Sequence, residues 1–244
     1  TMSKRLPLSV KTKQRESLLR MLNFNKEEDE DQRWEGDSWK VLIYDTHCSD
    51  IIAPLLRVHQ LREQGVTLHL LLHRDRQPVQ DVPAIYFVSP SQENVQRIGE
   101  DCAARLYENF HINFSSSLSK EIMEDLAAKT TRTDSVHLIR SVYDQYLDFI
   151  SLEHNLFSLN VKGSLVSCHH QKLTDEEAAR NVELVAERLF GVLVTMGIIP
   201  IIQCPRNGMA EHVARAVDKK LREHLLQGGS DSDRTMFSFQ RPVL

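Results

Sequence analysis

Short apolar runs alternate with amphipathic stretches through the middle of the chain. Runs rich in β-branched and aromatic residues predict strands at residues 40–44, 67–72, 84–88 and 110–114. Their nearly continuous apolar character is typical of strands that are buried on both faces of a parallel sheet. Between them, residues 51–64 and 90–109 have apolar positions at helical spacing. The alternation predicts an α/β fold with a mostly parallel sheet and flanking crossover helices.

Two consecutive helices are predicted after the fourth strand, without a strand between them. Ser119 is a good helix cap and starts the first helix, which is expected to end near Ala128. The second helix is predicted from Asp134 or Ser135 to Ile150, and the short polar segment between the two indicates a helical hairpin. Grooves between helices commonly accept short apolar peptides, so this hairpin is a candidate binding site.

The amino-terminal part is expected to form an arm and a linker. Apolar positions in residues 17–22 share one face of a helix that ends near Asn23. The following run, residues 26–37, is acidic and nearly free of aliphatic side chains, which indicates a solvated tether. We therefore assign residues 1–38 to the arm and linker and residues 39–150 to a first domain.

The truncated start of a second α/β domain is predicted for residues 151–244. Its expected elements are a small hairpin around Lys162 and Gly163, a long helix that Thr174 caps, a strand over residues 197–204 and a helix over residues 209–226. The last four residues have the pattern of an interrupted strand. One or two strands do not make a stable sheet, so this region is expected to be the opening part of a larger domain.

Composition excludes several classes of function. The formal net charge of −4 argues against a nucleic-acid partner, because such proteins usually carry a basic surplus. No apolar run approaches the roughly 18 to 20 residues that span a bilayer, so direct membrane insertion is not expected. The cysteines lack CxxC spacing, which is typical of a reducing, cytoplasmic compartment; they are Cys48, Cys102, Cys168 and Cys204.

The motifs of nucleotide and hydrolase chemistry are missing from the sequence. The first strand leads into Asp45 and residues 46–49 without the glycines that let a backbone approach a pyrophosphate. A nucleotide-dependent enzyme on a Rossmann-like sheet therefore stays only as the alternative interpretation. No GxSxG elbow offers a nucleophile. Neither a cofactor nor a catalytic residue is expected.

Two small groups of polar residues contain side chains that could bind a metal or act in catalysis. The run Cys168, His169 and His170 has ligand chemistry, but neighbours in a strand point to opposite faces and no second cluster has metal spacing. No metal site is expected. Asp45 and Asp50 follow the first strand, where α/β enzymes keep catalytic carboxylates, but helix capping is the more common role of such residues.

Longer stretches carry a more specific signal than these fragments. They are RMLNFN at 20–25, WKVLIYD at 39–45, TLHLLLHRDRQPVQDVPAIYFV at 67–88, FHINFSSSLSKEIMEDLA at 110–127, VYDQYLDFI at 142–150 and FSFQRPVL at 237–244. Together they resemble the SM (Sec-one/Munc-eighteen-like) family, and within it the ER–Golgi branch called Sly-one. The resemblance covers nearly the whole chain. Members of the family are much longer, so the chain is expected to be an amino-terminal fragment.

The resemblance implies a non-enzymatic regulator of SNARE assembly in ER–Golgi vesicle docking and fusion. Its first domain would be a five-stranded parallel sheet flanked by helices, and it would bind the amino-terminal peptide of a Golgi syntaxin. The assembled SNARE complex is a second expected partner. Such a protein is cytoplasmic and is recruited peripherally to ER–Golgi membranes through its SNARE partners.

The family's peptide pocket maps onto the predicted helical hairpin. It comprises two triplets at i, i+3, i+4 spacing, which are Met123, Leu126 and Ala127, and Ile139, Val142 and Tyr143. Glu124 and Asp125 are expected to form a polar rim that attracts an arginine of the peptide. The alternative is that both helical faces pack on each other or on the sheet and that the fragment is purely structural.

Overall fold

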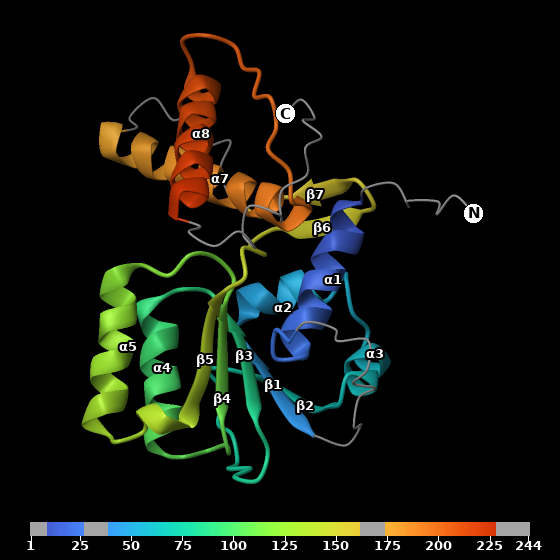
Figure 1. Cartoon of the computed structure of the whole chain (residues 1–244), viewed down its shortest axis with the longest axis vertical. Coiled ribbons are helices and arrows are strands. Elements are labelled where there is room, and N and C mark those ends of the chain that lie inside the picture. Colours follow the sequence, from blue (N-terminus) through green and yellow to red (C-terminus); the bar gives the residue numbers. More distant parts are fainter. Residues whose placement is uncertain (1–8, 27–38, 162–173, 228–244) are drawn as a thin grey trace. The chain divides into compact units, whose positions relative to one another are not determined.

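The computed structural model describes residues 9–26, 39–161 and 174–227 (Figure 1). Contacts divide the chain into two compact units: one comprises residues 14–145, and the other comprises residues 1–13 and 146–244. Some predictions fall outside the described residues. They concern the tether beyond Lys26, the hairpin around Lys162 and Gly163, the run Cys168 to His170, and the last four residues.

A five-stranded parallel sheet forms the core of the unit of residues 14–145. The strand order is β2-β1-β3-β4-β5, and every neighbouring pair is parallel. The strands are β1 (Lys40–Tyr44), β2 (Val66–Leu71), β3 (Ala84–Val88), β4 (Phe110–Phe114) and β5 (Ile139–Asp144). The four strands predicted from apolar runs and the expected sheet of five are confirmed.

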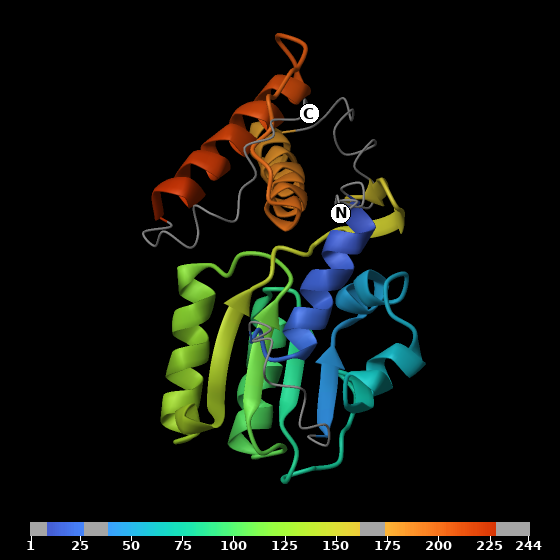
Figure 2. The same ribbon diagram turned by 45° about the vertical axis from the view of Figure 1, so that its right-hand side comes forward.

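Helices cover both faces of this sheet. They are α1 (Val10–Leu22), α2 (Thr46–Ile52), α3 (Val58–Glu63), α4 (Gln92–Ala103) and α5 (Lys120–Arg132). Figures 1 and 2 show α4 and α5 on one face and α1, α2 and α3 on the other. The single helix predicted over residues 51–64 is wrong: α2 and α3 are separate, because Pro54 lacks the N–H that would continue the first one. Gly65 ends α3 with a φ of 76°, a conformation that glycine adopts without strain.

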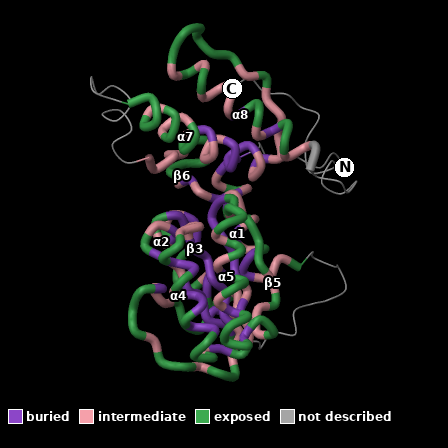
Figure 3. The backbone as a smooth tube through the Cα atoms, turned by 90° about the vertical axis from the view of Figure 1, so that its left-hand side faces the viewer, coloured by how far each residue is buried: buried purple, intermediate pink, exposed green. Residues whose placement is uncertain are grey.

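The main core lies between the sheet and the two helices α4 and α5. The central strands contribute fully buried residues to this core, and the purple stretches of the backbone in Figure 3 mark buried residues. They include Val41, Ile43, Tyr86, Val88, Phe110, Ile112 and Phe114. Helix α4 adds Val95 and Ile98, and α5 adds Leu126. Burial on this scale is the main favourable term in folding.

The fifth strand lies where the second helix was predicted, so the helical hairpin is wrong. Helix α5 is followed by a single 3-10 turn at Val136–Leu138, after which β5 pairs with β4. Asp134, at the start of the expected helix, has a φ of 52°, outside the right-handed helical region. Pairing with the edge of β4 therefore overrides the helical spacing of the local sequence.

A bulge in β5 explains why its sequence has helical spacing. The register shifts so that Ile139 lies opposite Phe110 while Val142, three residues later, lies opposite Ile112. Side chains of a strand otherwise alternate between faces with a period of two. The extra residue puts Ile139 and Val142 on the same face of the strand, at the spacing that a helix would also require.

The second unit contains a hairpin and two long helices among its described residues. These elements are β6 (Ile150–Glu153), β7 (Leu156–Ser158), α7 (Asp175–Met196) and α8 (Met209–Gln227). The predicted cap at Thr174 is confirmed, since its Oγ1 accepts the N–H of Glu177 at 3.3 Å. The strand predicted over residues 197–204 is wrong, because only Ile198 and Ile201 form isolated bridges there. Pro200 between them cannot donate to a ladder.

Candidate peptide-binding surface

Helix α5 provides one side of the predicted site. Its start is fixed by Ser119, whose Oγ accepts the N–H of Ile122 at 3.4 Å, as the sequence predicts. The helix continues to Arg132, four residues beyond its predicted end, with Lys129 and Arg132 in a last turn where positive charge is favourable. Leu126 and Thr130 are its buried positions, so the helix directs one stripe at the sheet.

Leu126 and Ile139 form the inner layer of the site. Leu126 is 4% exposed and belongs to the main core, and Ile139 is partly buried against the same core. For these two residues the packing alternative is therefore correct: their side chains stabilise the fold. They can offer a visiting side chain only a firm apolar base.

Met123, Ala127 and Val142 form the outer layer. Met123 and Val142 are 49% and 37% exposed, and Ala127 is exposed as well. Val142 lies opposite the buried Ile112, so it faces the side of the sheet that carries α5. Leu126 of α5 and Ile139 of β5 belong to the same core cluster, which ties the helix to this strand. We call Met123, Leu126, Ala127, Ile139 and Val142 the α5–β5 surface.

Tyr143 does not join this surface. It lies opposite Asn113 on β4, one position out of phase with Val142. Asn113 faces the other side of the sheet, where its Oδ1 accepts hydrogen bonds from Asn25 at 3.0 Å and from Gln145 at 2.8 Å. The structure thus brings together five of the six predicted apolar residues and places Tyr143 on the opposite face.

The predicted acidic rim is paired within α5. Lys120 lies 3.6 Å from Glu124 and Lys129 lies 2.6 Å from Asp125, both as i, i+4 pairs. Sequence reasoning missed a different carboxylate, that of Asp144 at the end of β5. Its Oδ2 accepts the N–H of Leu118 at 3.3 Å, and partial desolvation raises the pKa of Asp144. Its position after an apolar strand was the available signal, which the helix prediction obscured.

The place where this type of sheet binds nucleotides is filled by side chains. In the order 2-1-3-4-5 the strand order reverses between β1 and β3, and ligands bind at that point, beyond the strand ends. Here Asp45 accepts hydrogen bonds from the N–H groups of Cys48 at 2.7 Å and Ser89 at 2.8 Å, and from Asn94 Nδ2 at 2.8 Å. Burial opposes ionisation, but the hydrogen bonds from Cys48 and Ser89 lower the pKa of Asp45.

These contacts give Asp45 the capping role that the sequence predicts, because its side chain caps α2. Asp50 lies inside α2 and caps nothing, so the prediction for it is wrong. Among the residues that the structure describes, no group of three or more His, Cys, Asp and Glu residues could hold a metal ion. No helix in the same ranges is long and apolar enough to cross a membrane.

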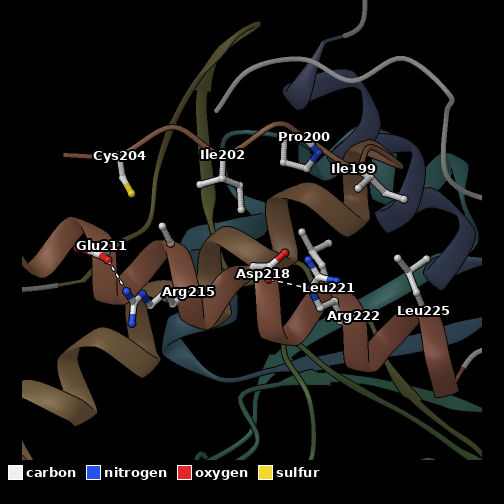
Figure 4. A pocket seen from close by; sticks show the side chains of 11 residues that line it. Ile199, Pro200, Ile202, Cys204, Glu211, Arg215, Asp218, Leu221, Arg222 and Leu225 are labelled. Carbon is white, nitrogen blue, oxygen red and sulfur yellow. Dashed lines mark hydrogen bonds and ion pairs between the residues drawn. The ribbon is translucent and has the colours of Figure 1, made fainter. Parts of the chain in front are cut away.

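A hollow of about 660 Å³ lies in the other unit between residues 199–204 and α8. Figure 4 shows Ile202 and Leu221 on its walls and two ion pairs along the helix. Arg215 pairs with Glu211 at 2.5 Å, and Arg222 pairs with Asp218 at 2.8 Å. These charges already neutralise one another, and the hollow holds no constellation that suggests catalysis. The sequence did not predict it.

Comparison with known proteins decides the family. The model of the Sec1 family matches residues 40–244. This chain belongs to the Sec1 family. It is 44% identical to the SEC1 family transport protein SLY1 of Arabidopsis thaliana, over 98% of this chain and 39% of that protein. It is also 44% identical to human Sec1 family domain-containing protein 1, over 97% of this chain and 38% of that protein. The chain thus spans about 39% of the length of its relatives.

Solved structures of Sec1 proteins share the fold. The crystal structure of Sly1p in complex with an N-terminal peptide of Sed5p superposes with a TM-score of 0.85 and is 37% identical, over 91% of this chain and 40% of that chain. Unc18 from Monosiga brevicollis, solved with syntaxin 1, has a TM-score of 0.77 at 23% identity and supports the fold alone. The resemblance to the Sly1 branch is confirmed.

Proposed function

We propose that this chain binds the amino-terminal peptide of a Golgi syntaxin at the α5–β5 surface and acts as a non-catalytic regulator of SNARE assembly. The observation that carries the proposal is the exposure of Met123, Ala127 and Val142 above an apolar base. Sly1p, which shares the fold, has been solved with a peptide of Sed5p. A role in ER–Golgi transport follows from membership in the Sly1 branch.

The layered build of the surface suits a single apolar anchor. Leu126 and Ile139 are held in place by the core. Their side chains therefore lose little conformational entropy when a peptide binds. Ala127 is small and leaves space beside Met123, whose flexible side chain can adapt to the guest. Burying a Phe or Leu anchor there would contribute about 1.5–3 kcal/mol.

Recruitment to membranes would follow from the same contact. A protein that binds the amino-terminal peptide of a membrane-anchored syntaxin becomes concentrated at the cytoplasmic face of ER–Golgi membranes, and it needs no membrane segment of its own for this. The assembled SNARE complex would be a second partner of the same regulator.

A substitution on the outer layer tests the proposal. Leu126 is unsuitable, because a charge at this core position would unfold the domain. Met123→Glu is expected to weaken binding of a labelled syntaxin amino-terminal peptide at least tenfold, about 1.4 kcal/mol, because it puts a charge beside the anchor. Leu68→Glu is the matched control: Leu68 is 44% exposed on β2, the opposite edge strand. Fluorescence anisotropy gives the affinities, and circular dichroism checks that both variants fold.

If Met123→Glu and the unmodified chain bind the syntaxin peptide with equal affinity, the α5–β5 surface is not the binding site. No detectable binding by the unmodified chain would favour the purely structural alternative. The nucleotide-enzyme alternative predicts a rise in melting temperature with ATP, GTP or NADH. Because Asp45 and Asn94 occupy the switch point, we expect no such rise.

A further inference from the structure

Asn207 and Gly208 lie in an exposed loop just before α8. Asn207 is the only asparagine in the sequence that is followed by glycine, and residues 203–208 are all exposed. We propose that Asn207 is a site of spontaneous covalent modification, at which its side-chain amide reacts with the backbone nitrogen of Gly208 and the neutral asparagine becomes an aspartate or an isoaspartate. The site belongs to the second unit, and its chemistry needs no peptide at the α5–β5 surface.

The reaction has two steps, and its only co-reactant is water. In the first step the Gly208 nitrogen loses its proton and attacks Cγ of Asn207, so that a new C–N bond closes a five-membered succinimide ring and the side-chain nitrogen leaves as ammonia. In the second step water adds to one of the two ring carbonyls. Opening at the former side-chain carbonyl gives aspartate. Opening at the former backbone carbonyl gives isoaspartate, in which the main chain runs through Cβ and Cγ.

The two reacting groups are not held by hydrogen bonds to the described part of the chain. Neither the side-chain amide of Asn207 nor the N–H of Gly208 has such a bond, whereas the carbonyl oxygen of Gly208 accepts the N–H groups of Glu211 at 3.0 Å and His212 at 3.4 Å. The N–H of Asn207 is also bound, since it donates to Glu211 Oε2 at 2.8 Å. A bonded amide would first have to break its bond, and here that cost is absent.

The space around Gly208 permits the ring to close. Closure requires rotation about the bond between Cα and the carbonyl carbon of Asn207, and then a close approach of the two reacting groups. A side chain on the following residue obstructs this approach, and glycine has none. Even a Cβ added at Gly208 would meet no atom within 4 Å. No neighbouring group therefore blocks the ring.

Other asparagines lack one or more of these features. Asn155 is exposed in the turn between β6 and β7, but it precedes the branched Leu156. Asn94 and Asn113 are buried, and the Nδ2 of each donates a hydrogen bond. Asn155 is therefore an internal reference for the effect of the following residue, because its exposure matches that of Asn207.

The modification would alter the first turn of α8. Either product adds a negative charge next to Glu211, whose Oε1 pairs with Arg215. Isoaspartate also lengthens the main chain by one carbon just before Gly208, whose carbonyl oxygen accepts the N–H groups of Glu211 and His212. We expect the displaced carbonyl to loosen this turn, so that both amides exchange their hydrogens faster in the isoaspartyl form.

Ageing of the full chain tests the site. The folded protein is incubated at mildly alkaline pH, and mass spectrometry follows the peptides that contain Asn207 and Asn155. We expect the Asn207 peptide to exchange NH2 for OH at least about tenfold faster than the Asn155 peptide, because glycine leaves the attacking nitrogen accessible. An isoaspartyl methyltransferase with labelled S-adenosylmethionine identifies the isoaspartate, since it esterifies that carboxylate and not the carboxylate of an ordinary aspartate.

Gly208→Ala is the matched variant. Its Cβ meets nothing within 4 Å and Gly208 does not have a positive φ, so the fold is kept, while the methyl group should slow conversion at least about tenfold. Asn207→Gly removes the amide, suits the φ of 58° at this position and should abolish the methyl label at this site. Circular dichroism checks that both variants fold.

Three outcomes would overturn the assignment. One is conversion at Asn155 as fast as at Asn207, which would show that the following glycine has no effect. Another is an unchanged rate in Gly208→Ala. The third is conversion of Asn207 only after unfolding in urea, which would show that the fold protects the amide.

Discussion

Lys40 is a buried cation that joins the arm to the sheet. Its Nζ donates to the carbonyl oxygen of Leu22 at 2.8 Å, at the end of α1, and lies 4.8 Å from the centre of the Phe24 ring. A cation is favourable at the carboxyl end of a helix and over an aromatic face. Burial, with a smaller contribution from Lys26, lowers the pKa of Lys40 to about 8.

This pKa predicts a pH dependence of stability. The folded value of about 8 lies below the ordinary value of 10.5, so the unfolded chain binds more protons between the two. The contribution of Lys40 to the free energy of unfolding should therefore rise with pH in this window, by on the order of 2 kcal/mol between about pH 7.5 and about pH 9.5. Urea titrations of the chain and of Lys40→Met measure it as a difference. Lys120→Met, at an exposed lysine, is the control, and parallel pH profiles for all three proteins would contradict the assignment.

A buried ion pair holds the loop after β2 to α4. Arg76 and Asp101 lie 2.7 Å apart with side chains that are 1% and 2% exposed, and Tyr86 donates to the same carboxylate at 2.9 Å. Removing one partner leaves a buried charge. We expect Arg76→Met to lower the free energy of unfolding by about 3–5 kcal/mol, and the double variant with Asp101→Asn to recover part of the loss. Chemical denaturation measures both, and additive losses would contradict the pairing.

At the scale of elements, the sequence predicted best where local pattern and tertiary environment agree. The central strands are apolar along their whole length because both faces are covered, so they could be recognised without the fold. The helix caps at Ser119 and Thr174 act within a few residues, so they could also be predicted from the local sequence. The prediction failed at β5, because the bulge in this strand gives Ile139 and Val142 the spacing of a helix. Only pairing with the edge of β4 makes the segment a strand and not a helix.

The same element explains what could be predicted of the site. Met123, Leu126 and Ala127 keep their predicted relation because α5 is a helix. Tyr143 was misplaced, since a strand sends neighbouring residues to opposite faces. Asp144 was missed for the same reason, because inside a helix it would not have lain in line with Val142.

Gly191 of helix α7 lies close to the backbone of Tyr146. A Cβ added at Gly191 would lie 3.0 Å from the carbonyl oxygen of Tyr146, which is backbone and cannot easily move. We expect Gly191→Ala to destabilise the second unit by about 1–3 kcal/mol through overpacking. Gly208→Ala is the matched control, because a Cβ there meets nothing within 4 Å. Thermal unfolding compares the two, and equal stability would show that the helix shifts freely.

At the scale of the whole molecule, the two units differ in the kind of core that they hold. The unit of residues 14–145 buries a sheet between layers of helices. The described part of the other unit has α7 packed on α8 around a smaller cluster that includes Phe190, Leu193, Val217 and Leu221. Fewer buried contacts mean that local opening requires less free energy.

Hydrogen exchange should reveal this difference. Amides of β3 and β4 are expected to exchange more slowly than those of α7 and α8, because the strands open only with the whole sheet. Mass spectrometry of peptides covering residues 84–88, 110–114, 182–196 and 209–225 would measure it. Similar protection in all four peptides would contradict the expectation.

The link between Asp45 and Asn94 also bears on regulation. Asn94 donates to Asp45 between the ends of β1 and β3, where related folds bind nucleotides, so a nucleotide would have to displace this contact in order to bind there. If no nucleotide binds there, binding of the proposed syntaxin peptide at β5, the far edge of the sheet, would not depend on the nucleotide levels of the cell. Regulation of this binding would have to come from the amount of the partner or from covalent modification of its amino-terminal peptide.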